Sequence, residues 1–234
     1  MPMTYFQSSQ PLPPACGNSA LARLAEGPRY ALLRRLAPAI RHDMAGSLQP
    51  ISMVAAMLEK RLQKPDPDLL AMGRNVNAIN ALAREAAQSC MQLMTWLAPK
   101  ADAPVAVGAG VAEAISLVAT ELAFKGFTLV NETESVAVML PVSVLRGLFI
   151  GSVVAMTDHH TGPGRVVLQA RSGDGDRDTL VLSVAFEPGD GQAMPGMPAS
   201  YRRLEWADMH AIALAESVEL VQTSHRVELR CAVP

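Results

Sequence analysis

The chain has 234 residues, half of them apolar and 18% charged, so it can form a core and is not an intrinsically disordered chain. Twenty lysines and arginines against 22 aspartates and glutamates give a net charge of −2, which excludes a protein that binds nucleic acid through its overall charge. Aromatic residues make up only 4%, too few for a platform on which single-stranded bases stack.

The first half is predicted to be a helical hairpin. Residues 1–20 are rich in proline, serine and glutamine, and we expect residues 1–26 to be a mobile tail. Apolar residues three and four positions apart then predict helices over about 29–63 and 69–97, joined by the turn KPDPD at 64–68. The expected stripes are Leu33, Leu36, Ile40, Met44, either Ser47 or Leu48, Ile51, Val54, Leu58 and Leu62, then Val76, Ile79, Ala83, Ala86, Cys90, Leu93 and Leu97. Two helices cannot bury both stripes, so residues 27–98 are predicted to form a four-helix bundle with a second copy, making a homodimer.

The second half is predicted to be an α/β domain over residues 104–234. Prolines and glycines at 97–110 separate it from the hairpin. Beyond them, the pattern predicts helices over 111–124, 141–158 and 204–217, and strands over 127–131, 136–139, 164–170, 179–186, 219–223 and 226–232. Mixed strands with helices on one side indicate a two-layer α/β sandwich, so the fold class is α followed by α/β.

The cysteines and the apolar runs indicate the compartment. Cys16, Cys90 and Cys231 are far apart and form no CxxC pair, which argues for a reducing compartment and against a disulfide framework or a zinc knuckle. No stretch approaches the roughly 18 consecutive apolar residues of a membrane span. The N-terminus lacks the basic flank and apolar run of a signal peptide. We therefore expect a cytoplasmic protein with no membrane or nucleic-acid partner.

The string RHDMAGSLQPI at 41–51 is the most informative part of the sequence. His42 lies two residues from both Ile40 and Met44, so it is predicted to point away from the apolar stripe, with Asp43 directly after it. Gly46 and Pro50 both weaken a helix, which is typical of a functional site rather than of packing.

Three further residues are predicted to share the helix surface with His42. Ala45, Gly46 and Gln49 follow it by three, four and seven positions. Ala45 and Gly46 are small enough for a second protein to bring its backbone close to the imidazole. Arg41, together with Arg34 and Arg35, is either a solvated basic face or a surface that steers an acidic partner.

The arrangement His42-Asp43-x-x-Gly46 on the first helix of a long hairpin, followed by an α/β domain, resembles the dimerisation and phosphotransfer domain of bacterial histidine kinases. The resemblance implies that His42 is the phosphoacceptor and that Asp43 orients or deprotonates it. A neutral imidazole is a competent nucleophile near pH 7. We expect Arg41, Ala45, Gly46 and Gln49 to contact the partner.

The second half departs from the ATPase domain of that family. Gly151 and Ala155 fall where the family has asparagines that hold magnesium, and neither can supply an oxygen ligand from its side chain. The segment 187–191, EPGDG, resembles a remnant of the adenine-binding box, and the helix near 204–217 has no glycine to let its amides approach phosphates. The resemblance therefore implies a degenerate ATPase domain that binds neither ATP nor metal.

This combination resembles the ChpT-type histidine phosphotransferases. The resemblance implies a homodimer that relays a phosphoryl group between aspartates of response-regulator receiver domains, with a hybrid histidine kinase as a further partner and magnesium supplied by the receiver. The alternatives are an ATP-dependent histidine kinase without a sensor, and a non-catalytic scaffold that binds receivers. Separately, His159 and His160 are predicted to cap a helix C-terminus, with metal binding as the alternative.

Overall fold

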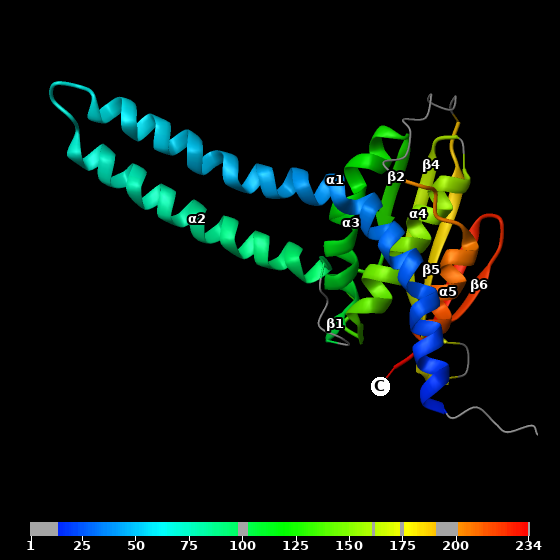
Figure 1. The fold of residues 1–234 in the computed structure, drawn as a ribbon. Helices are drawn as coiled ribbons and strands as arrows, with labels where there is room; N and C mark the ends of the chain where they lie inside the picture. The colour runs from blue at the N-terminus through cyan, green and yellow to red at the C-terminus, as the bar shows by residue number, and fades with distance from the viewer. Residues whose placement is uncertain (1–13, 98–102, 161, 174–175, 191–200, 234) are drawn as a thin grey trace, which may run out of the picture.

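The computed structural model describes residues 14–97, 103–160, 162–173, 176–190 and 201–233. A long helical hairpin projects from an α/β sandwich (Figure 1). The hairpin consists of α1 (Pro14–Leu62) and α2 (Leu69–Leu97), which agrees with the predicted second helix at both ends. The backbone N–H of Ala71 donates to Oδ1 of Asp68 at 2.9 Å, which satisfies an amide at the start of α2 and fixes where this helix begins.

The N-terminal part of α1 corrects the prediction of a mobile tail over residues 1–26. Residues 14–26 are helical, Ala25 is fully buried, and this part of α1 packs against α5 (Trp206–Ala215). Residues 1–13 lie outside the described residues. Pro28 and Pro38 inside α1 remove backbone hydrogen bonds, and contact with the α/β domain compensates for this loss.

The same contact corrects part of the predicted dimer stripe. Leu36 and Ile40 are buried in the core of their own chain rather than left for a second copy. Figure 1 shows α1 changing direction where it leaves the α/β domain. Pro38 lies in the last turns that pack on this domain, and an interior proline is a sufficient cause for a bend.

The second half is the predicted α/β sandwich. Its main sheet has the order β2-β4-β5-β7-β6, in which β2 and β4 are parallel and the other pairs are antiparallel. The strands are β2 (Phe127–Asn131), β4 (Gly164–Gly173), β5 (Asp176–Pro188), β6 (Glu219–Gln222) and β7 (Arg226–Ala232). Helices α3 (Val107–Phe124), α4 (Ile150–His159) and α5 cover the face on which Leu168, Leu182 and Leu229 are buried.

The region around Pro141 differs from its prediction. Pro141 ends a short strand, β3 (Met139–Pro141), which pairs with β1 (Pro104–Ala106), where a helix start was expected. Helical residues begin at 142, one position after the predicted start, and the helix continues as the π-helix η1 (Val144–Phe149) and then as α4. Leu140 is almost fully buried, so this small sheet closes one end of the core.

Among the residues that the structure describes, one helix has the length and composition of a membrane span. Helix α3 has 18 residues with a mean hydropathy of 1.5, and 44% of it is buried inside the protein. Its residues Val111, Ala114 and Val118 belong to the main core cluster. A core helix of a folded domain satisfies the same criteria.

Candidate functional site

His42 projects from α1 just beyond the part of the helix that packs on the α/β domain. Its side chain is 87% exposed, as the sequence predicts, and its Nδ1 lies 3.5 Å from Oδ1 of the half-exposed Asp43. Packing therefore does not account for the histidine, because almost none of its ring is covered. Arg41, Ala45, Gly46 and Gln49 are also exposed, and a Cβ added to Gly46 would meet nothing within 4 Å. This surface is open to close approach by another protein.

Helix α3 forms a second wall beside His42, which the sequence did not reveal. His42 and Asp43 line a cleft of about 310 Å³ between α1 and α3. Its walls include Pro38, Ala39, Leu117, Thr120, Phe124 and Lys125. Phe124 is 71% exposed at the end of α3. The sequence offered no signal for this wall because an apolar residue at a helix end is normally assigned to the core.

A buried ion pair lies behind the cleft. Nη1 and Nη2 of Arg35 donate to the two carboxylate oxygens of Asp158 at 2.6 and 3.0 Å. The side chains of Arg35 and Asp158 are 2% and 5% exposed. Burial alone would lower the pKa of Arg35, and hydrogen bonds and charge from Asp158 and Glu121 outweigh this, so its pKa is raised. Both sequence-based interpretations of Arg35, a solvated face and a steering charge, are therefore wrong.

The positions that the family resemblance assigns to the nucleotide site lie inside the protein. Gly151 and Ala155 are buried on α4. A Cβ added to Gly151 would lie 2.8 Å from Sδ of Met209 on α5 and 3.5 Å from Cδ2 of Leu32 on α1. Side chains of α1 and α5 thus cover this face of α4. The segment that resembles the adenine box ends β5, where Glu187, Gly189 and Asp190 are exposed, and Gly191 lies outside the described residues.

The paired histidines cap α4, as predicted. Nδ1 of His159 and Nδ1 of His160 lie 2.8 Å from the carbonyl oxygens of Ala155 and Met156. Both carbonyls belong to the C-terminal part of α4, where histidine side chains can hydrogen-bond the last carbonyls of a helix. Within the part of the chain that the structure describes, no group of three or more histidine, cysteine, aspartate or glutamate residues could hold a metal ion.

Comparison with known proteins gives similarity in structure only. No protein-family model and no curated protein matches the chain. Among solved structures, it is similar to the Acinetobacter baumannii histidine kinase AdeS, with 12% identity, TM-score 0.43, and coverage of 82% of this chain and 98% of that one. It is also similar to a histidine kinase from Burkholderia phymatum STM815, with 18% identity, TM-score 0.44, and coverage of 85% of this chain and 98% of that one. The histidine kinase domain of the blue-light activated histidine kinase from Erythrobacter litoralis EL346 has 15% identity and a TM-score of 0.38. The match covers 92% of this chain and 94% of that one.

Proposed function

We propose that this chain is a histidine phosphotransferase of two-component signalling, which relays a phosphoryl group between receiver aspartates through His42. The observation that carries the proposal is the 87% exposure of this imidazole, beside a carboxylate and at the mouth of a cleft between the hairpin and the α/β domain. A nucleophile that must meet an acyl phosphate held by another protein needs this accessibility.

The chemistry requires one nitrogen of His42 to be free. Oδ1 of Asp43 lies 3.5 Å from Nδ1, and its negative charge favours the tautomer that carries the ring proton on Nδ1. The lone pair of Nε2 then attacks phosphorus, the bond between phosphorus and the aspartyl oxygen breaks, and the receiver carboxylate leaves. The Nδ1 proton of the resulting phosphoimidazolium passes to Asp43 or to water. Transfer onward to a second receiver aspartate reverses these steps, and the receiver brings the magnesium.

The packing around α4 favours a protein donor over ATP. The side chains of Gly151 and Ala155 offer no oxygen atom to a magnesium ion. Leu32 and Met209 occupy the space next to Gly151, so a nucleotide on this face would first have to displace α1. These contacts support the proposal that the α/β domain lacks kinase activity.

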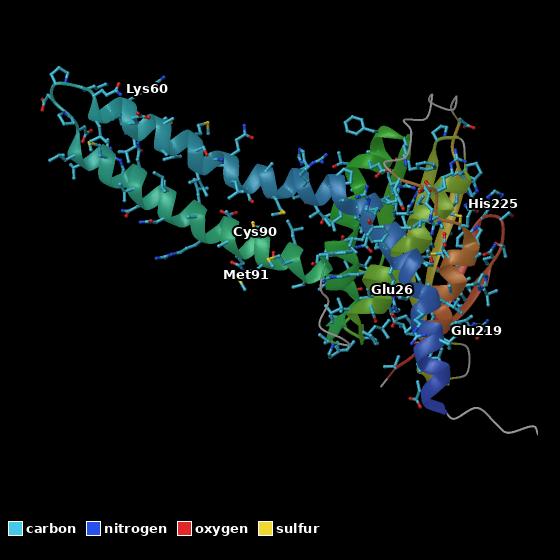
Figure 2. The ribbon with its side chains drawn as sticks, in the orientation of Figure 1. Glu26, Lys60, Cys90, Met91, Glu219 and His225 are labelled. Atoms are coloured by element: carbon cyan, nitrogen blue, oxygen red, sulfur yellow. The ribbon has the colours of Figure 1, made fainter. Side chains whose placement is uncertain are left out.

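The hairpin supports the proposed homodimer. Figure 2 shows Met91 directed away from α1 and Cys90 directed toward it. On α2, exposed residues at steps of three and four lie along one side of the helix, and most of them are apolar or small. We call it the outer stripe: Leu69, Gly73, Val76, Asn80, Ala83, Ala87, Met91 and Met94. A second hairpin that covers it would complete a four-helix bundle.

A relay assay tests the function. One purified receiver domain is phosphorylated with radiolabelled acetyl phosphate, freed of the small phosphodonor, and mixed with a second unlabelled receiver. The proposal predicts that label reaches the second receiver only when the chain is present, and that His42→Gln abolishes this. Transfer that survives in His42→Gln would contradict it.

A further inference from the structure

The buried pair of Arg35 and Asp158 joins α1 to several elements at once. Asp158, near the end of α4, accepts both hydrogen bonds from Arg35 and a third from the backbone N–H of Leu204 at 3.1 Å. Arg35 also donates to Oε1 of Glu121 on α3 at 3.3 Å. One side chain of α1 is thereby tied to α3, to α4 and to the segment that precedes α5.

Energy alone does not explain why this pair is buried. Removing both charges from water costs about as much as their attraction returns, so buried ion pairs add little net stability. What a bidentate pair of a planar guanidinium and a carboxylate does supply is a fixed relative position and orientation.

That orientation bears directly on His42. His42 follows Arg35 by seven positions, and at about 100° per residue the two side chains project from nearly the same side of α1. Ala39, between them, lines the same cleft as His42. Three prolines interrupt the backbone hydrogen bonds of α1, so the helix needs an external contact to fix its direction. A rotation of α1 by one residue position would turn His42 away from the α3 wall.

We propose that Arg35 and Asp158 are positioning residues that clamp α1 to the α/β domain and so hold His42 at the cleft. The hairpin and the α/β domain then behave as one rigid body during phosphotransfer. The effect on transfer rests on the proposed function, whereas the clamp itself can be measured without any receiver.

The experiment measures the position of the hairpin relative to the sheet. In the full-length chain, Cys16, Cys90 and Cys231 are replaced by serine, and spin labels are attached to cysteines introduced at the exposed Lys60 and Glu187. The test variant, Arg35→Met with Asp158→Asn, removes both buried charges and keeps an acceptor for the Leu204 amide. The matched control, Arg202→Met with Asp208→Asn, removes another bidentate pair, with distances of 2.6 and 2.9 Å, that does not involve α1.

Labelled chain is mixed with an excess of unlabelled chain of the same sequence, so that a dimer reports only the distance within one chain. The clamp then predicts one narrow distance distribution in the parent and in the control, and a broadened or shifted one in the test variant. It also predicts that the test variant accepts phosphoryl groups at least about tenfold more slowly at saturating receiver, while its circular dichroism spectrum is retained. An unchanged distribution in the test variant would overturn the clamp. A broadened distribution with an unchanged rate would overturn its positioning role. If the parent accepts no phosphoryl group, the proposed function fails, and the distance measurement still decides whether the clamp exists.

Discussion

Leu32 of α1 lies against Gly151 of α4, with its Cδ2 3.5 Å from the place that a Cβ of residue 151 would occupy. The first helix of the chain therefore packs on the face of α4 that the family resemblance assigns to the nucleotide. The hairpin and the α/β domain share one core cluster, which includes Ala31 and Leu32.

This contact predicts that residue 151 cannot be changed to the asparagine that the family has there without loss of stability. Gly151→Asn would push against Met209 and Leu32 and would bury an amide, so we expect it to lower the free energy of unfolding by about 2–4 kcal/mol and to create no affinity for Mg-ATP. Urea unfolding and calorimetric titration measure the two effects. The matched control is Gln88→Asn on α2, which introduces the same residue at an exposed helical position outside the outer stripe and should change the free energy of unfolding by less than about 0.5 kcal/mol. Unchanged stability together with Mg-ATP binding in Gly151→Asn would contradict the interpretation.

The outer stripe predicts a dimer that a single charge can disrupt. Met91 is 71% exposed in one chain, so Met91→Glu should leave the folded monomer intact and weaken the dimer at least about tenfold by burying a carboxylate in the interface. Light scattering across a concentration series measures the change. Gln88→Glu, one turn earlier and outside the outer stripe, places the same charge on α2 and should leave the dimer intact. A wild-type chain that stays monomeric at tens of micromolar would refute the proposed bundle.

How much the sequence revealed depended on whether the signal was local. Helix α2 and strand β2 agree with their predictions, because the turn KPDPD at 64–68 and the run Phe127–Asn131 are local signals. The start of α1 was missed, since proline-rich sequence predicts no helix and only contact with the α/β domain makes this part of α1 stable. The burial of Arg35 was also missed, because its partner Asp158 is 123 positions away.

The candidate site was predicted only in part. The exposure of His42 and the open surface around Gly46 follow from helical geometry, which the string at 41–51 already contains. The α3 wall of the cleft could not be predicted, because the path of the chain between α2 and α3 decides which side of α3 faces His42. The packing of Leu32 on Gly151 likewise depends on tertiary structure.

Asp43 is predicted to set the rate of transfer rather than the affinity for the partner. Asp43→Asn keeps the size of the side chain and removes the charge beside Nδ1 of His42, so we expect phosphoryl acceptance to slow by about 10–100-fold with little change in KM. Rapid-quench kinetics with a phosphorylated receiver separates the two parameters. Asp66→Asn, in the exposed turn of the hairpin, should match the wild type. A rise in KM alone would indicate that Asp43 contacts the receiver instead.

The start of α5 predicts a specific pH dependence of stability. Burial would raise the pKa of Asp208, but hydrogen bonds from Arg202 and from the Glu205 amide, together with the charge of Arg202, outweigh it and lower the pKa below 3.8. The stabilisation is therefore present above pH 3.8 and is lost as pH falls through the lowered value.

Asp208→Asn should reduce the free energy of unfolding by about 1 kcal/mol at pH 7, and the difference should shrink below pH 4. Urea unfolding from pH 7 to pH 3 follows this difference. Glu219→Gln, which removes an exposed ion pair with Arg230, should cost almost nothing at either pH. A difference between Asp208→Asn and wild type that stays constant over this range would exclude the charged pair as its source.

Direct labelling of His42 tests the central claim. Purified chain is incubated either with radiolabelled ATP and magnesium or with a panel of labelled receiver domains freed of their small phosphodonor, and any label is tested for the acid lability of phosphohistidine. We predict label from at least one receiver and none from ATP, with all label lost in His42→Gln, a variant that should fold normally because the ring is 87% exposed. Label acquired from ATP alone, or label that persists in His42→Gln, would contradict the account.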